Sequence, residues 1–159
     1  MYRGKGSISP AHLGLHLVRQ FPRWLRQAFR LVVLADTAFG SVDFLKGLRK
    51  LKLHAITGVR YDRLLQDGRQ LFHLHKPGQQ VRLQGLDFLV IVAWFYLKRE
   101  KGKPRLKRYV LSTKPLKAST MGGIVGRSKA GSRQRNTALG CIALVNQPGW
   151  VYITGWCCR

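Results

Sequence analysis

The sequence predicts an α/β fold, and three consecutive segments lead to this class. The apolar, β-branched run at 31–35 has the composition of a buried strand, and so does the run at 53–59. Between them, residues 44–51 carry apolar side chains at helical spacing. Strand, helix and strand in this order form a βαβ unit, whose two strands run parallel and whose crossover is right-handed. The chain is therefore expected to contain a partly parallel sheet.

A helix is predicted before this unit, beginning at Ser9 and Pro10. A serine hydroxyl caps free backbone N–H groups, and proline is favoured at the first helical position. Pro22 should break or kink the helix, because proline cannot donate the helical hydrogen bond. Ser41 is expected to cap the helix of the βαβ unit in the same way as Ser9. Apolar residues recur at helical spacing along the first helix: Leu13, Leu17, Val18, Phe21, Trp24, Leu25 and Ala28.

After Asp62 the pattern changes to short strands joined by Gly, Pro and Lys turns. The last two strands flank the basic segment 98–104 and are expected to pair as a long hairpin. From residue 119 the apolar periodicity ends, and the segment is expected to be disordered. The expected strands cover 70–76, 79–86, 88–97 and 105–112. The expected domains are a core at 1–62, a β-rich insertion at 63–118 and a basic tail at 119–159.

The charge of the chain predicts a polyanionic partner. Lys and Arg total 29 against 6 acids, which gives a net charge of +23. Surfaces of soluble domains usually mix both signs, so nucleic acid is the expected partner. The longest apolar run, 88–97, is too short to span a bilayer, so no membrane is expected. The odd, crowded cysteines Cys141, Cys157 and Cys158 favour a reducing cytoplasm.

Asp36 is the candidate functional residue. It ends the first strand of the predicted βαβ unit, at the carboxyl edge where open α/β sheets place their sites. A carboxylate there suits a hard cation such as Mg²⁺. An aspartate that caps the following turn explains the same position equally well. Both interpretations stay open on the residues alone.

The stretch Leu31 to Leu48, with its core Ala35-Asp36-Thr37-Ala38-Phe39-Gly40-Ser41, resembles the second-aspartate motif of DDE transposases of bacterial insertion sequences, in the IS-four-like group. The similarity extends to the following motifs and covers roughly residues 2–120: Arg3-Gly4-Lys5-Gly6, Gly58-Val59-Arg60-Tyr61-Asp62, Trp94-Phe95-Tyr96-Leu97 and Leu111-Ser112-Thr113-Lys114.

This resemblance implies a partial RNase-H-like core at 1–62 and a function in DNA transposition. In that group three carboxylates hold two divalent metals, normally Mg²⁺, for DNA strand cleavage and transfer. Asp36 matches the middle carboxylate, so it is the catalytic and metal-binding residue that the resemblance transfers. Double-stranded DNA is the implied partner, and a bacterial, nucleoid-associated cytoplasmic location is the implied setting.

The chain departs from the family pattern in its other two carboxylates. No acid precedes Asp36 and none follows Glu100, so the first Asp and the final Glu of the family have no counterpart. We therefore expect no intact catalysis by this chain alone. A shifted reading of codons chosen for Leu144 to Tyr152 gives Phe-Gly-Gln-Ser-Thr-Arg-Leu-Gly-Val-Tyr, which resembles the C-terminal segment of such transposases. This motivates the hypothesis that the chain is truncated and translated out of frame from about residue 120.

Three alternatives remain on the sequence. The chain is a non-catalytic basic nucleic-acid-binding protein, such as an RNA-packing protein, in which Asp36 has no metal. The tail from residue 120 is a genuine DNA-binding segment in its own frame. Lastly, the chain does not fold, because strand edges left without neighbours favour aggregation.

Overall fold

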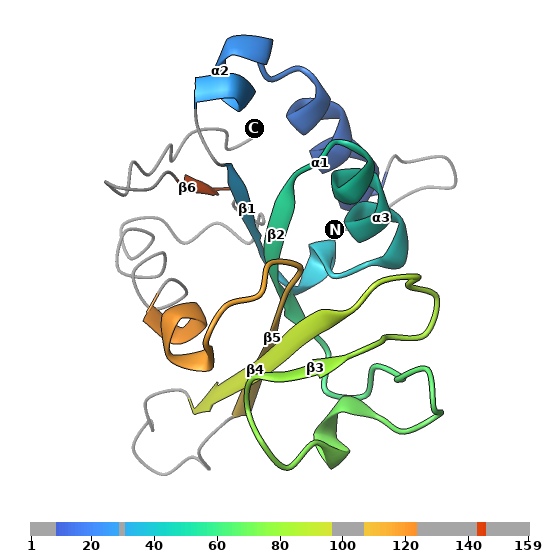
Figure 1. The fold of residues 1–159 in the computed structure, drawn as a ribbon. Helices are drawn as coiled ribbons and strands as arrows, with labels where there is room; N and C mark the ends of the chain where they lie inside the picture. The colour runs from blue at the N-terminus through green and yellow to red at the C-terminus, as the bar shows by residue number, and fades with distance from the viewer. Residues whose placement is uncertain (1–8, 29–30, 97–106, 124–142, 146–159) are drawn as a thin grey trace, which may run out of the picture.

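The computed structural model describes residues 9–28, 31–96, 107–123 and 143–145, and Figure 1 shows their arrangement. The elements along the chain are α1 (Pro10–Arg19), α2 (Arg23–Ala28), β1 (Val32–Ala35), η1 (Thr37–Phe39), α3 (Val42–Lys50), β2 (His54–Val59), η2 (Leu71–His73), β3 (Gln79–Val81), β4 (Val90–Tyr96), β5 (Lys107–Ser112) and β6 (Ala143–Val145). The fold is α/β, as the sequence predicts.

The strands form one mixed sheet in the order β3-β4-β5-β2-β1-β6. Among the described strands, only the neighbours β1 and β2 run parallel, with Val33 opposite Ala55 and Ala35 opposite Thr57. The remaining neighbours are antiparallel, including the predicted β4–β5 hairpin, in which Trp94 lies opposite Tyr109. The predicted βαβ unit is therefore confirmed, and it lies beside the antiparallel part of the sheet.

The helix of this unit, α3, is defined at both ends by local hydrogen bonds. Ser41 is its N-cap, as predicted, and its hydroxyl accepts from the backbone N of Phe44 at 3.3 Å. At the other end, the Leu53 N–H donates to Leu48 O and the Lys52 N–H donates to Arg49 O. This is a Schellman ending, whose left-handed position is filled here by Lys52 with φ 57° and not by glycine.

The N-terminal helix is interrupted where the sequence predicts. Ser9 caps α1 by accepting from the His12 N–H at 3.3 Å, and the helix ends at Arg19. Pro22 separates it from the short α2. The approach of α1 to α3 depends on Gly47, since a methyl group there would lie 2.6 Å from Cδ1 of Leu15.

Core residues lie on both faces of the sheet. Alternation along β1 sends Val33 to the face covered by α1 and α3, and Leu34 to the opposite face. The helix-side cluster includes Phe44, Leu45 and Leu48 of α3, all without solvent exposure. Because both faces of β1 and β2 are covered, their sequences read as continuous apolar runs without a polar alternation.

Two predicted strands are wrong or shortened. Residues 70–76 form no strand; the segment contains the 3-10 helix η2, capped at Gln70. Leu71 and Leu74 are both buried at a spacing of three, which suits a 3-10 turn and not the two-residue alternation of a strand. The predicted strand 79–86 is reduced to β3, because the chain turns at Gly85 with φ +85°.

The ordered structure extends past the predicted boundary at residue 119. Residues 118–123 form a helical turn that covers the second face of the sheet (Figure 1), and Met121 is fully buried there. A methyl group at Gly122 would lie 2.7 Å from Phe95, so this turn packs closely on β4. The short β6 pairs with β1. The rest of the predicted disordered tail lies outside the described residues.

A search of the described residues finds no helix with the length and apolar character needed to cross a bilayer.

Candidate functional site

Asp36 lies where the sequence places it, directly after β1 at the carboxyl end of the parallel pair. Its backbone is extended, and its side chain caps η1: Oδ1 accepts from the Thr37 N–H at 2.7 Å. The Phe39 N–H donates to Asp36 O at 3.0 Å and completes the turn. The carboxylate is solvent-exposed. The turn-cap interpretation is thus realised in the structure.

The turn that carries Asp36 is held against β2 by two glycines. A methyl group at Gly58 would lie 2.5 Å from Thr37 Oγ1 and 2.9 Å from Thr37 N. At Gly40 it would lie 2.7 Å from Gly58 O. Sequence analysis did not single out Gly58 as a functional position, although a glycine inside a strand often marks a close backbone approach.

The core anchors the same turn from the helix side. Phe39 is buried, and its ring lies 5.3 Å from the ring of Phe44 at an angle of 56°. Thr57, one residue before Gly58, has no solvent exposure, and its Oγ1 has no hydrogen-bond partner. The turn that carries Asp36 is therefore packed against β2 and, through Phe39, against α3.

Two other carboxylates are engaged with neighbouring arginines. Asp62 accepts from Arg60, and the hydrogen bond with the guanidinium lowers the pKa of Asp62. Asp67 accepts from Arg69 Nη2 at 2.7 Å, and that hydrogen bond likewise lowers the pKa of Asp67. Both acids remain charged and form ion pairs with arginines two residues away in the chain.

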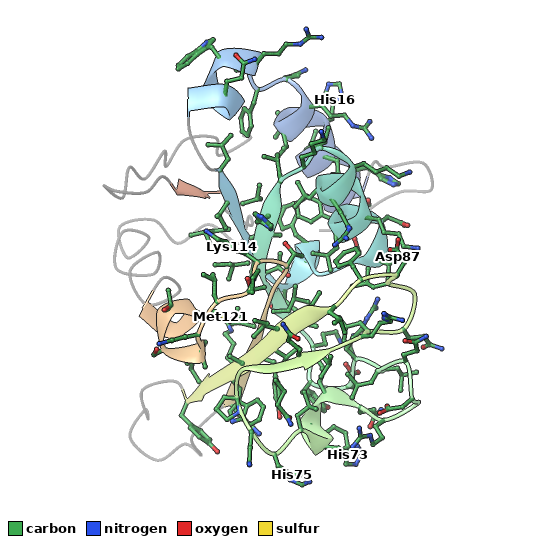
Figure 2. The ribbon with its side chains drawn as sticks, viewed as in Figure 1. His16, His73, His75, Asp87, Lys114 and Met121 are labelled. Carbon is green, nitrogen blue, oxygen red and sulfur yellow. The ribbon has the colours of Figure 1, made fainter. Side chains whose placement is uncertain are left out.

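The donor set around Asp36 does not fit a two-metal Mg²⁺ site. Within the described part of the chain, no three His, Cys, Asp or Glu side chains come close enough together to hold a metal ion. The histidines are dispersed: Figure 2 shows His16 on α1, and His73 and His75 at the opposite end of the molecule. Glu100 and the three cysteines lie outside the described residues. A lone carboxylate does not supply the ligands that such a reaction centre needs.

A cationic and aromatic cluster lies at the end of the hairpin where β4 finishes and β5 begins. Lys107 Nζ lies 4.2 Å from the ring centre of Trp94 and 4.9 Å from that of Tyr109, and the two rings are 5.7 Å apart. Tyr96 continues this end of β4 and is 53% exposed. The cluster lies beside the basic segment 98–104, which is outside the described residues.

A second cationic region lies at the amino end of β2. Burial lowers the pKa of His54, and the positive charges of Lys114 and Arg49 lower it further. The strand end is fixed by Thr113, whose Oγ1 accepts from the Ala55 N–H at 2.8 Å. Arg49 lies over the ring of Phe88 at 4.4 Å. Cationic groups therefore stand at both ends of the sheet's central strands.

Comparison of the chain with models of protein families, with curated proteins and with solved structures finds no match.

The contact between η1 and β2 predicts the effect of Gly58→Ala. The added methyl group would displace the turn that carries Asp36, so the variant should lose about 1–3 kcal/mol of unfolding free energy in urea denaturation. Thr37→Ala should recover part of this loss in the double variant, because Oγ1 is the nearest atom. A Gly58→Ala protein as stable as the wild type would show that the two segments do not touch.

The environment of His54 predicts a pH dependence of stability. Since the pKa of His54 is lowered on folding, the unfolded chain binds the proton more readily, and stability should fall as the pH drops below the ordinary value of 6.5. His54→Gln should flatten the stability curve between about pH 7.5 and pH 5, measured by urea denaturation. Lys114→Met should reduce the slope less, because burial contributes more than its charge. An unchanged slope in His54→Gln would assign the dependence to other groups.

Proposed function

We propose that this chain is part of a DDE transposase of the IS-four-like group, with a partial RNase-H-like core, and that it binds duplex DNA without cleaving it by itself. The observation that supports this most directly is the placement of Asp36. It follows a buried strand, at the carboxyl end of a parallel pair, on a turn fixed by Gly40 and Gly58. This is the location that the resemblance assigns to the middle carboxylate of the family.

The absence of cleavage by this chain alone follows from the count of carboxylates. Strand cleavage and transfer in that family use two metals, which activate the attacking oxygen and stabilise the leaving oxygen. Among the described residues, Asp36 belongs to no group of three or more side chains that could hold a metal ion. Mg²⁺ is therefore a property of the complete family site, and no step of a reaction is assigned to the residues present here.

DNA binding is supported by the excess of positive over negative charge. Against 29 Lys and Arg the chain carries 6 acids, and two of these, Asp62 and Asp67, already pair with neighbouring arginines. Cationic side chains stand along both ends of the sheet, with Lys107 near one end and Lys114 near the other (Figure 2 labels Lys114). Contacts of this kind bind phosphates in any sequence and position the duplex.

A non-catalytic basic nucleic-acid-binding protein is the rival proposal, and one observation favours it. The Asp36 carboxylate already has a structural role, because it accepts the Thr37 N–H at 2.7 Å. A capping aspartate needs no metal, so the position alone is compatible with a protein that has never cleaved DNA.

The two roles of Asp36 are separated by Asp36→Asn. Asparagine also caps a turn, so the fold should be kept. We expect the variant to bind a DNA duplex no more weakly than the wild type. For both proteins the binding constant should fall by roughly 0.9 log units per phosphate neutralised for each tenfold rise in salt concentration. Fluorescence anisotropy between low and physiological salt measures this. No Mg²⁺-dependent nicking of the duplex is expected from either protein.

Asp43→Asn is the matched control, because it removes one exposed acid from the first turn of α3 with the same change in charge. Mn²⁺ binding that Asp36→Asn abolishes and Asp43→Asn keeps would establish the metal-ligand role. Equal Mn²⁺ responses in the two variants would leave the cap as the function of Asp36. Nicking by the wild-type chain would overturn the proposal that it does not cleave alone.

The proposed relation to transposases predicts the nucleotide sequence around the coding region. An upstream frame should encode an aspartate on an apolar strand, and a shifted frame over residues 120–159 should encode a glutamate on a basic amphipathic helix. Sequencing several hundred bases on each side tests both expectations. If neither frame supplies its acid, the basic-binder proposal takes precedence and the tail is a genuine one.

A further inference from the structure

Three aromatic rings form an exposed surface on the segment between β2 and β3. The rings of Tyr61 and Phe72 are 6.2 Å apart, and those of Phe72 and His73 are 4.1 Å apart. Tyr61 is 60% exposed and Phe72 is 44% exposed. We call Tyr61, Phe72 and His73 the aromatic platform. Large apolar side chains gathered in solvent often mark a binding surface.

Backbone hydrogen bonds hold the platform rigid. The Phe72 N–H donates to Tyr61 O at 3.1 Å, which joins the two segments that carry the rings. The next residue inward, Leu71, is fully buried, and its N–H donates to Arg63 O at 2.9 Å. The His73 ring accepts from the Gln70 N–H at the start of η2. The exposed rings are thus presented by an ordered backbone, so little entropy would be lost when they bind a partner.

Basic residues lie close to these rings in the chain. Arg63 comes two residues after Tyr61, and its backbone O accepts from the Leu71 N–H. His75 and Lys76 follow His73 and are exposed, and Figure 2 shows His73 and His75 at the same end of the molecule. Tilted aromatic rings with basic residues close by in the chain differ from a purely apolar patch, and they match a ligand that has both flat faces and negative charge.

We propose that the aromatic platform binds the unpaired bases of single-stranded nucleic acid. A base offers a flat face for stacking on Tyr61 or Phe72, and the adjoining phosphates suit the exposed Lys76. A duplex keeps its base faces stacked inside the helix, so the platform should prefer unpaired strands. This inference rests on the proposed nucleic-acid binding and adds to it the form of nucleic acid and the residues that select it.

A second copy of this chain is a less suitable occupant. Two copies meeting here would bring like charges together, since the exposed Lys76 follows the platform in the chain and the whole chain carries +23. The neighbouring acids do not compensate, because Asp62 and Asp67 are already paired with Arg60 and Arg69. Charge therefore favours a polyanion over self-association.

The test measures binding of a labelled oligothymidine of about 15 nucleotides by fluorescence anisotropy, with the full chain. Phe72→Ala and Tyr61→Ala should each weaken binding about tenfold. Phe72→Trp should keep the affinity, because tryptophan also offers an aromatic face. Phe72→Leu should lower the affinity, because leucine has apolar bulk but no aromatic face. Trp24→Ala is the matched control: Trp24 is 62% exposed on α2, away from the platform, and its removal should leave binding unchanged.

An abasic strand of the same length separates stacking from phosphate contact. The wild type should bind it more weakly than oligothymidine, and the platform variants should weaken it no further. The inference is overturned if the platform variants behave like Trp24→Ala, if they weaken the abasic strand equally, or if they convert an oligomer to a monomer in size-exclusion chromatography.

A duplex of the same length distinguishes the two proposals. Platform variants that bind the duplex normally but show no defect on the single strand defeat this inference and leave the proposed function standing. If the wild type binds neither form at low salt, the proposed function fails, and this inference fails with it. Circular dichroism of each variant verifies that the fold is kept.

Discussion

The parallel pairing of β1 with β2 is the constraint on which the rest of the structure depends. Its two strands are short, so most of their stability comes from burial on both faces: α1 and α3 on one side, the turn carrying Met121 on the other. Apolar burial of this kind contributes about 1.5–3 kcal/mol for each large side chain. The same pairing brings Gly58 against the turn after β1 and thereby fixes Asp36.

The elements that depend on local chemistry were predictable from sequence. Ser9, Ser41 and Pro22 define helix ends through hydrogen bonds that the residue types themselves provide or remove, and the apolar run before Asp36 identifies β1. Prediction failed where tertiary contacts override local pattern. Residues 70–76 look strand-like, but Leu71 and Leu74 must both face the core three positions apart. The burial of Met121 follows from the face it covers, which no local pattern specifies.

The candidate site was predicted in position but not in environment. The end of an apolar run locates Asp36, yet only the folded chain shows that its carboxylate caps η1 and that, among the described residues, it is part of no group of three metal-binding side chains. The pairing of Asp62 with Arg60 was equally hidden, because adjacent opposite charges need not point at each other. The aromatic platform was missed for a related reason: Tyr61 and Phe72 are distant in sequence and meet through one backbone hydrogen bond.

The sheet order has a consequence for how this architecture tolerates change. Because β2 pairs directly with β5, the chain leaves the sheet after Val59 and returns to its edge as β3, before β4 and β5 lead back to β2. Doubling the length of such a closed loop costs only about 0.6 kcal/mol of chain entropy. Added residues at exposed positions between Val59 and β3 should therefore cost little stability. Leu71 and Leu83 are different, because they share one buried cluster with Val33 of β1, so changes there reach the strands that position Asp36.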